Sequence, residues 1–242
     1  MYMNVLHLEE LASTNSYAMK LANEGVEECT VVRADVQTHG RGRRDRIWHS
    51  DEGGLWFSII LYPEIAANEG FSLTMLSSVA VAQALGSLGV NPGIKWPNDI
   101  LIDGKKVCGI LSEFEASDGK ITTAVLGVGL NVNNELPGEL EKATSLKKHL
   151  GRKVDMEALF NDILKIFNEY YVGGMTDRDI LIRWILYSVV LWRWMKVSVR
   201  GEEKVCFVKG IDRTGRLVIN VNGEIETIAA DEIEYIEERG SR

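Results

Sequence analysis

The chain has 242 residues, of which 45% are hydrophobic and 26% charged, and its formal net charge is -8. This length and composition indicate a soluble globular protein with one main core and room for one small extra domain. They exclude a low-complexity or disordered chain. The acidic balance argues against a surface for duplex nucleic acid, because such surfaces need a basic face.

No segment indicates a membrane span or a secretion signal. The apolar stretch 180–195 is interrupted by two arginines and is too short and too charged to cross a bilayer. The N-terminus lacks the basic and apolar regions of a signal peptide. The three cysteines, Cys29, Cys108 and Cys206, are odd in number and widely spaced. We therefore expect a cytoplasmic protein whose cysteines are buried apolar residues.

The first half of the chain predicts a helix, two strands and a second helix. Ser13-Thr14-Asn15 precedes apolar residues at helical spacing, and side-chain oxygens of this kind cap helices, so a helix should begin there. Residues 29–36 and 55–61 are rich in strand-forming residues and predict neighbouring core strands. Residues 71–88 carry one apolar stripe and predict an amphipathic helix.

The second half predicts a hairpin, two further helices and a separate β-rich tail. Residues 105–115 and 121–131 read as strands joined by an Asp-Gly turn. Asp155 should cap a helix, and a tryptophan-rich helix should end near Trp194. The short alternating runs that follow predict a small β-barrel. We predict two domains, residues 1–194 and 195–242.

Residues 40–48, Gly-Arg-Gly-Arg-Arg-Asp-Arg-Ile-Trp, form a predicted loop with four arginines and one carboxylate; we call it the arginine loop. Glycine lets the backbone approach an anion, and arginine offers planar, permanently charged donors that suit carboxylate and phosphate. A solvated charged turn is the ordinary alternative. The density of arginine in an acidic chain favours a site for a small anion.

A second polar cluster, Lys95-Trp96-Pro97-Asn98-Asp99, lies between apolar strand-like runs, where buried polar groups must find partners. The alternative is a structural turn. The Lys106 side chain could place its own positive charge in the same cleft, although a lone lysine is more often a surface residue. The alternating glycines of residues 127–131 suit either a ligand that lies flat on the sheet or simple packing. No metal-ligand spacing of histidines, nucleophile elbow or Walker loop is present, which argues against hydrolase triads and P-loop enzymes.

These motifs, with Gly-Ile-Leu-Ser-Glu at 109–113, occur in the order found in biotin protein ligases, and the chain resembles that family over nearly its whole length. The likeness is to the form without an N-terminal helix-turn-helix repressor domain. It implies an α+β fold of the class II synthetase-like biotin/lipoate ligase type. That fold has a mixed, largely antiparallel sheet with flanking helices, followed by a small SH3-like barrel.

The resemblance also implies a reaction. Biotin and ATP, with Mg²⁺, would give biotinyl-5′-AMP and pyrophosphate, and the biotin would pass to a lysine of a biotin carboxyl carrier protein or domain. We expect no DNA partner, no membrane partner and a homodimer.

Site residues follow from the resemblance, position by position. The implied biotin-binding residues are Ser13, Thr14, Asn15, Gln37, Gly40, Arg41, Gly42, Arg43, Trp48, Lys106, Gly109 and Gly129. The implied ATP-binding residues are Arg41, Arg43, Arg44, Arg46, Trp48, Lys95, Asn98, Lys106 and Asn131. The first three biotin-binding residues and Gln37 would bond the ureido ring, and Lys106 would meet both the carboxylate and the α-phosphate. No dedicated set of metal ligands is expected.

The chemistry of the residues agrees with these roles. Two unit charges about 4 Å apart repel by about 4 kcal/mol at an effective dielectric of about 20. Arg41, Arg43 and Lys106, with Mg²⁺, are the available compensation when a carboxylate meets a phosphate. Asp99 is the candidate that orients or deprotonates the acceptor lysine. The predicted catalytic residues are therefore Arg41, Lys106 and Asp99.

Two departures from the family pattern and two rival functions remain. Asp45 stands where the family usually has glycine and could stiffen the loop or pair with Arg43 or Arg46. Leu191-Trp192-Arg193 replaces a common Leu-Gly-basic sequence. The rival functions are a lipoate or octanoate protein ligase or transferase, and a non-catalytic nucleic-acid-binding module.

Overall fold

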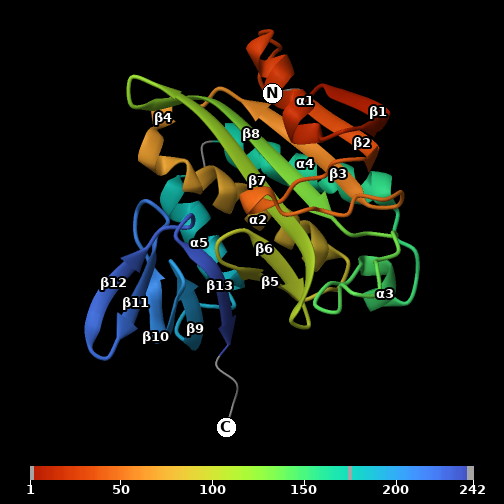
Figure 1. The fold of residues 1–242 in the computed structure, drawn as a ribbon. Helices are drawn as coiled ribbons and strands as arrows, with labels where there is room; N and C mark the ends of the chain where they lie inside the picture. Colours follow the sequence, from red (N-terminus) through yellow and green to blue (C-terminus); the bar gives the residue numbers. More distant parts are fainter. Residues whose placement is uncertain (1–2, 174–175, 239–242) are drawn as a thin grey trace.

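The computed structural model describes residues 3–173 and 176–238, which form a large sheet, a small sheet and flanking helices (Figure 1). The large sheet has the strand order β1-β2-β3-β8-β7-β6-β5, with β4 beside β8. Its strands are β1 (Val5–Leu11), β2 (Val31–Gln37), β3 (Leu55–Leu61), β4 (Ile65–Ala66), β5 (Pro92–Lys95), β6 (Asp99–Ile102), β7 (Lys105–Ser117) and β8 (Lys120–Leu130). β1 and β2 are parallel and the other pairings in this sheet are antiparallel. The predicted mixed, largely antiparallel sheet is confirmed.

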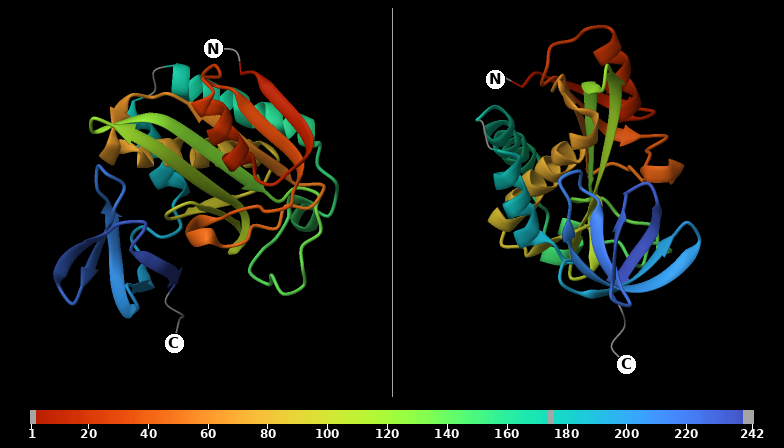
Figure 2. Two further views of the ribbon diagram at one scale, coloured as in Figure 1. Left: turned by 45° about the horizontal axis from the view of Figure 1, so that its top comes forward. Right: turned by 90° about the vertical axis from the view of Figure 1, so that its left-hand side faces the viewer.

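Helices cover both faces of the large sheet. They are α1 (Thr14–Asn23), α2 (Phe71–Ser87), α3 (Leu146–Leu150), α4 (Met156–Val172) and α5 (Asp177–Tyr187), with short 3-10 turns η1 (Arg43–Asp45) and η2 (Ala67–Glu69). Val32, Ile60 and Val125 pack with α1. The adjacent strand residues Val31, Ile59 and Leu126 instead belong to a second hydrophobic core, which they form with residues of α2, α4 and α5. Successive strand residues point to opposite faces, so the two cores lie on opposite sides of the sheet (Figure 2).

The capping and turn predictions are confirmed. The Ser13 hydroxyl accepts from the Ser16 amide at 3.4 Å, and the Asp155 carboxylate accepts from the Ala158 amide at 3.0 Å. Asp118 and Gly119 have φ of 51° and 76°. Such left-handed pairs make the tight turn that joins β7 to β8.

The helix α2 differs from the predicted amphipathic helix. Twelve of its seventeen residues are buried, because α4 and α5 cover the side turned away from the sheet. Ser77 and Ser78 satisfy their hydroxyls on the carbonyls of Leu73 and Thr74. Residues 67–87 are long and apolar enough to cross a membrane by length and composition, but most of that segment is buried in the protein, as in a core helix.

The predicted tryptophan-rich helix is too long. α5 ends at Tyr187, and the Val189 amide then donates to the Ile94 carbonyl of β5 at 3.0 Å. This pairing with the sheet edge replaces further helical hydrogen bonds. Trp192 and Trp194 therefore lie outside the helix.

The C-terminal segment forms an antiparallel sheet in the order β12-β11-β10-β9-β13. Its strands are β9 (Trp194–Val199), β10 (Glu202–Ile211), β11 (Leu217–Val221), β12 (Glu224–Ile228) and β13 (Ile233–Glu238). It lies at the end of the molecule away from α1 (Figures 1 and 2). The indole of fully buried Trp96 donates to the Gly215 carbonyl at 3.0 Å, which fixes this sheet against the large one. The boundary at 194/195 and the SH3-like description stay predictions.

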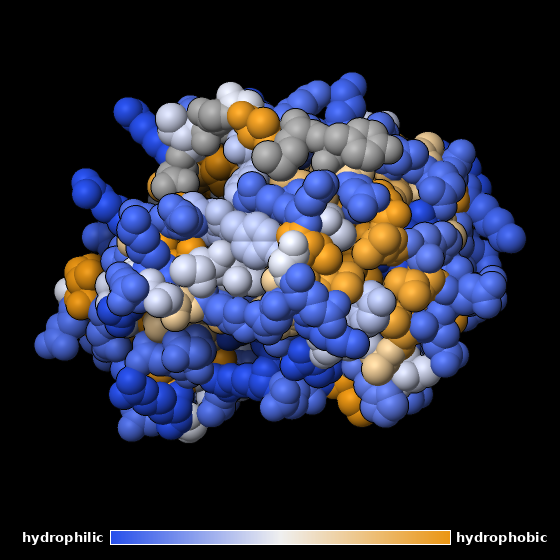
Figure 3. Space-filling view, turned by 90° about the horizontal axis from the view of Figure 1, so that it is seen from above, coloured by the Kyte–Doolittle hydropathy of each residue, from blue (hydrophilic) through white to orange (hydrophobic). Residues whose placement is uncertain are grey.

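The face seen from above, on the side of the N-terminal elements, is mostly hydrophilic with a group of apolar side chains (Figure 3). Such a surface agrees with the high charged fraction of the chain.

Candidate active site

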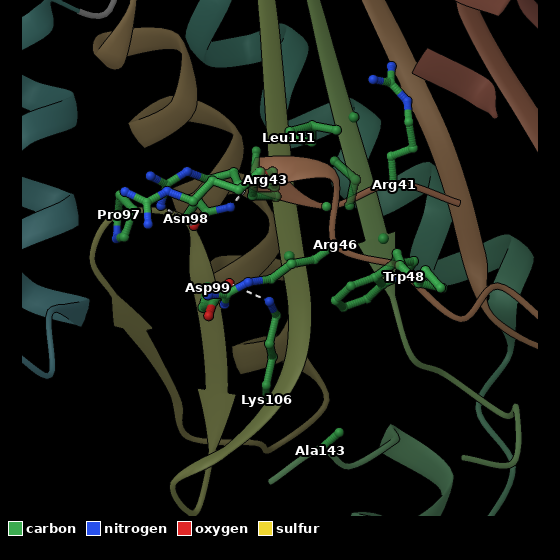
Figure 4. A pocket seen from close by; sticks show the side chains of 18 of the residues that line it. Arg41, Arg43, Arg46, Trp48, Pro97, Asn98, Asp99, Lys106, Leu111 and Ala143 are labelled. Carbon is green, nitrogen blue, oxygen red and sulfur yellow. Dashed lines mark hydrogen bonds and ion pairs between the residues drawn. The ribbon is translucent and has the colours of Figure 1, made fainter. Parts of the chain in front are cut away.

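A cavity of about 350 Å³ lies between the arginine loop, strands β5 to β8 and strand β13. It brings together residues that are far apart in the sequence (Figure 4). The predicted site residues that line it are Ser13, Thr14, Asn15, Gln37, Arg41, Gly42, Arg43, Arg44, Arg46, Trp48, Lys95, Asn98, Asp99, Lys106, Gly109, Gly129 and Asn131. Apolar residues that the sequence did not indicate complete the walls: Leu111, Val128, Leu136, Leu140, Ala143, Ile233 and Ile236.

Gly40 is the one predicted site residue that does not line the cavity. A Cβ atom there would lie 2.3 Å from the Trp48 carbonyl oxygen and 2.5 Å from the Ser50 hydroxyl. The glycine therefore allows the two ends of the arginine loop to approach each other. Its place among the biotin-binding residues stays a prediction.

The glycines of β7 and β8 make room for larger side chains on the sheet. A Cβ at Gly129 would lie 2.5 Å from the Trp48 indole nitrogen, and one at Gly109 would lie 3.2 Å from the same ring. A Cβ at Gly127 would lie 2.0 Å from the Asn15 side-chain oxygen. Close approach therefore explains these glycines, and Trp48 and Asn15 lie directly on the strands.

One end of the cavity is a network of neutral polar groups. The Gln37 side-chain oxygen accepts from the amide of Thr14 at 2.8 Å and from its hydroxyl at 3.1 Å, and the Gln37 nitrogen donates to Ser50 at 2.8 Å. Ser13, Thr14 and Asn15 are all buried at the start of α1. This end can recognise a small polar ring that has its own donors and acceptors.

The Lys106 ammonium and the Asp99 carboxylate lie at the other end, with Nζ 2.6 Å from Oδ1 (Figure 4). The two residues come from neighbouring antiparallel strands, β7 and β6. The same ammonium lies 4.9 Å from the centre of the Trp48 ring. The cation is thus held by a charge on one side and by an aromatic face on the other.

The arginine loop rests on the C-terminal sheet. Arg43 donates to the Ala230 carbonyl and, at 3.4 Å, to Asn98; Arg44 donates to the Asp231 carbonyl at 2.5 Å. Arg46 donates to the Glu234 carbonyl at 3.5 Å. These acceptors are neutral, so the positive charges of Arg43, Arg44 and Arg46 are left for an anion to neutralise.

Burial among other cations lowers the pKa values of Arg43 and Lys95. Burial lowers the pKa of Arg43, and the neighbouring Arg44 lowers it further. Burial also lowers the pKa of Lys95, against the opposing effect of Asp99. An anion placed among these groups would stabilise their charged forms.

Arg41 points away from the pair of Lys106 and Asp99 (Figure 4). Its Nη2 atom lies 3.0 and 3.1 Å from the two oxygens of Glu113 and 3.2 Å from the Ser16 hydroxyl. The guanidinium is thus engaged with β7 and α1. Its predicted role in charge compensation stays a prediction.

Asp45 adopts φ of 54°, a conformation in which glycine is easily accommodated. Among the ion pairs of residues 3–173 and 176–238, none joins Asp45 to Arg43 or Arg46, so of the two possibilities pairing is not found. The departure from glycine is met by backbone conformation instead. Trp192 likewise has φ of 57° where glycine is common.

The cysteines are buried and unpaired. Burial raises the pKa of Cys29 and of Cys206 to about 11 and also raises the pKa of Cys108. Such thiols stay protonated near neutral pH and are poor nucleophiles. The interpretation of the cysteines as buried apolar residues is confirmed.

Comparison with known proteins identifies the family. The model of the biotin/lipoate A/B protein ligase family matches residues 8–131. The chain belongs to the biotin/lipoate A/B protein ligase family. The predicted family is therefore confirmed, and the matched range carries most residues that line the cavity.

Relatives of this ligase-family chain include enzymes named for biotin. It is 38% identical over 239 residues to the bifunctional ligase/repressor BirA of Bacillus subtilis (strain 168), covering 96% of this chain and 74% of that protein. It is 30% identical to the biotin–(acetyl-CoA-carboxylase) ligase of Paracoccus denitrificans, covering 91% of this chain and 96% of that protein. Both relatives are named as ligases.

A solved structure confirms the predicted fold. The biotin protein ligase from Aquifex aeolicus in complex with biotin and ATP matches with a TM-score of 0.82 and 28% sequence identity. The match covers 98% of this ligase-family chain and 100% of that chain.

Proposed function

We propose that this chain is a biotin protein ligase. It would convert biotin and ATP to biotinyl-5′-AMP and pyrophosphate, and then transfer the biotin to a lysine of a carboxyl carrier protein. One observation carries the proposal: a single cavity has a neutral polar network around Thr14 and Gln37 at one end and the cations Arg43 and Lys106 at the other. Biotin has a polar ureido ring and a carboxylate at opposite ends. The biotin names of the Paracoccus denitrificans relative and of the Aquifex aeolicus structure support this substrate over lipoate.

In the first step, a biotin carboxylate oxygen would attack the α-phosphorus of ATP and pyrophosphate would leave. The carboxylate is already ionised at neutral pH, so the step needs no general base. It needs two anions held together. Lys106 and Arg43 are the cavity cations best placed to reduce their repulsion, and electrostatic stabilisation of this kind is a large term in catalysis.

In the second step, the acceptor lysine would attack the acyl carbon of biotinyl-5′-AMP and AMP would leave. The lysine must first lose a proton. The Asp99 carboxylate is already engaged by the Lys106 ammonium, with Oδ1 2.6 Å from Nζ. We therefore favour orientation of Lys106 as the role of Asp99, over direct deprotonation of the acceptor.

Mg²⁺ would arrive with ATP. Within the described residues no group of three or more His, Cys, Asp or Glu side chains is placed to hold a metal ion. Magnesium sites that act on nucleotides commonly use phosphate oxygens and water with few protein ligands. The charged residues of the cavity fit this arrangement better than a metal site made of protein ligands alone.

Lipoate use is the rival within the family. A linear acyl chain with a dithiolane ring does not need the polar contacts of Ser13, Thr14 and Gln37. Titration calorimetry with biotin and with lipoate, combined with pyrophosphate release in the same samples, separates the two. We expect saturable binding and pyrophosphate with biotin; release with lipoate and none with biotin would overturn the proposal.

We also propose a cytoplasmic homodimer with no DNA or membrane partner. β6 pairs with β7 only as far as Gly109, so residues 112–117 of β7 have no strand on their outer side within the described chain. Unpaired strand edges of this length readily pair with a second copy. Light scattering should give a dimer mass, whereas a monomer at micromolar concentration would refute the proposal. We also propose that residues 195–242 are a separate SH3-like domain, which the separate five-stranded sheet of this segment supports.

A further inference from the structure

We propose that Glu113 is a positioning residue that sets the hydrogen-bond polarity at the polar end of the cavity. This inference rests on the proposed function, because it concerns how that end recognises the ureido ring of biotin. Glu113 does not line the cavity. It acts through Asn15, which does.

Glu113 bonds the side chain of Asn15. Its carboxylate lies 2.7 Å from the Asn15 side-chain nitrogen, and the same nitrogen lies 3.0 Å from the Leu111 carbonyl oxygen. A carboxylate and a carbonyl can only accept hydrogen bonds. Both hydrogens of the Asn15 amide nitrogen must therefore point toward β7. Its side-chain oxygen must point the other way, and since Asn15 is 4% exposed it cannot turn to water instead.

The orientation of Asn15 then fixes the next hydroxyl. Ser58 is fully buried, and its Oγ atom lies 2.6 Å from Asn15 Oδ1 and 2.8 Å from Thr14 Oγ1. A hydroxyl has one hydrogen to donate. Asn15 Oδ1 can only accept, so the Ser58 hydrogen is committed to it.

Thr14 comes next in the chain of hydrogen bonds. Its hydroxyl hydrogen is drawn within the network, either to Ser58 or to the Gln37 side-chain oxygen at 3.1 Å. The Thr14 oxygen can therefore offer a ligand only its lone pairs. An acceptor at this place suits the N–H groups of a ureido ring, and an acyl chain without N–H groups would leave it unpaired.

Arg41 explains why the charge of Glu113 is tolerated there. The guanidinium bonds both carboxylate oxygens, and it belongs to the arginine loop. At the other end of the network Gln37 donates to Ser50, whose hydroxyl donates to the Trp48 carbonyl at 3.1 Å. Glu113 thus connects both ends of the loop to the polar end of the cavity.

Glu113→Gln is the direct test. The glutamine amide can donate as well as accept, so the Asn15 amide is no longer held in one orientation and the hydroxyls beyond it lose their fixed direction. We expect the KM for biotin in the pyrophosphate-release assay to rise about tenfold or more, as loss of a charged hydrogen bond does, with the KM for ATP within about twofold. A loss of general packing would instead change both KM values or the thermal stability.

The matched control is Glu115→Gln. Glu115 lies two residues further along β7 and is exposed, and within the described residues its carboxylate accepts a hydrogen bond only from Asn23, at 3.3 Å. The Glu115→Gln substitution removes a negative charge from the same strand as Glu113→Gln does. We expect its KM for biotin to equal that of the unmodified protein.

Ser58→Ala keeps the inference falsifiable if Glu113→Gln does not fold, because it breaks the same network without removing a charge. We expect a selective rise of about threefold or more in the KM for biotin. An unchanged KM for biotin in Glu113→Gln, or in Ser58→Ala where the first variant is unfolded, would overturn this inference while leaving the ligase function intact. Absence of biotin-dependent pyrophosphate from the unmodified protein would overturn both.

Discussion

Lys106 and Asp99 form an ion pair across two neighbouring strands, with Nζ 2.6 Å from Oδ1, beside the face of Trp48. The pair comes from two separate sequence motifs, and the pairing of β6 with β7 brings them together. The ammonium is therefore held in place before any ligand enters. A fixed cation stabilises a developing charge better than a mobile one, because it needs no reorganisation during the reaction.

Asp99→Asn tests whether this carboxylate orients Lys106 or acts as a base. The amide can still contact the ammonium but carries no charge, so Lys106 should be less well placed in both half-reactions. We expect adenylate formation and transfer to the carrier lysine to slow by similar factors, about tenfold to a hundredfold, in separate single-turnover assays. Loss confined to the transfer step would show instead that Asp99 is the base.

Lys106→Ala should remove the cation that meets the carboxylate and the α-phosphate. We expect adenylate formation to fall by about a hundredfold or more, which is typical for loss of one such donor, with little change in thermal unfolding. Lys105→Ala is the control, since Lys105 is the exposed neighbour on the same strand. Equal rates in the two variants would refute the assignment.

Gly129→Ala should displace Trp48 from its place on β8. The added Cβ would lie 2.5 Å from the indole nitrogen, which is too close for any real contact. We expect adenylate formation to fall by about tenfold or more, following the cost of misplacing groups that position a substrate. Gly86→Ala, where nothing lies within 4 Å of the added atom, should retain full activity. Full activity in Gly129→Ala would contradict the steric argument.

Lys95 gives a prediction for pH dependence. Burial lowers its pKa, so it loses its proton at a lower pH than an ordinary lysine does. Its charge is present below that pKa and is lost as the pH rises through it, and the KM for ATP should rise over the same range. Lys95→Arg stays charged and should move this rise to higher pH. An identical pH profile for the two proteins would exclude Lys95 from the nucleotide site.

Trp96→Phe tests the contact between the two sheets. The substitution removes the donor to the Gly215 carbonyl and leaves a smaller side chain in a fully buried place. We expect the free energy of unfolding to fall by about 1–3 kcal/mol, which lowers the melting temperature by about 2–4 °C for each kcal/mol. Trp194→Phe, at a half-exposed position, should change it by less than about 0.5 kcal/mol. Equal melting temperatures for the two variants would show that Trp96 does not stabilise the contact between the two sheets.

Local features of the sequence predicted much of the fold, and the family resemblance predicted most of the polar residues that line the cavity. Ser13, Asp155 and the Asp118-Gly119 turn act on backbone groups within a few residues, so their effects are visible in short segments. The polar motifs were recognisable because each interrupts apolar strands. Their meeting in one cavity follows from the resemblance to biotin protein ligases, since no local pattern fixes which strands are neighbours.

The contacts that sequence reasoning missed join distant segments. Asn15 and Glu113 are 98 residues apart, and Arg43 and Ala230 are 187 residues apart. A backbone carbonyl such as that of Ala230 exists at every residue and has no sequence signature. The close approach of Gly40 to the Trp48 carbonyl and the Ser50 hydroxyl is likewise visible only in the folded chain.

Pyrophosphate release in a single turnover tests the central claim most directly. The purified protein is mixed with ATP and Mg²⁺, with and without biotin, and the products are then offered to a biotin carboxyl carrier domain. We expect pyrophosphate only when biotin is present, followed by a mass increase of the carrier by one biotinyl group. Biotin-independent pyrophosphate release, or none in any sample, would contradict it.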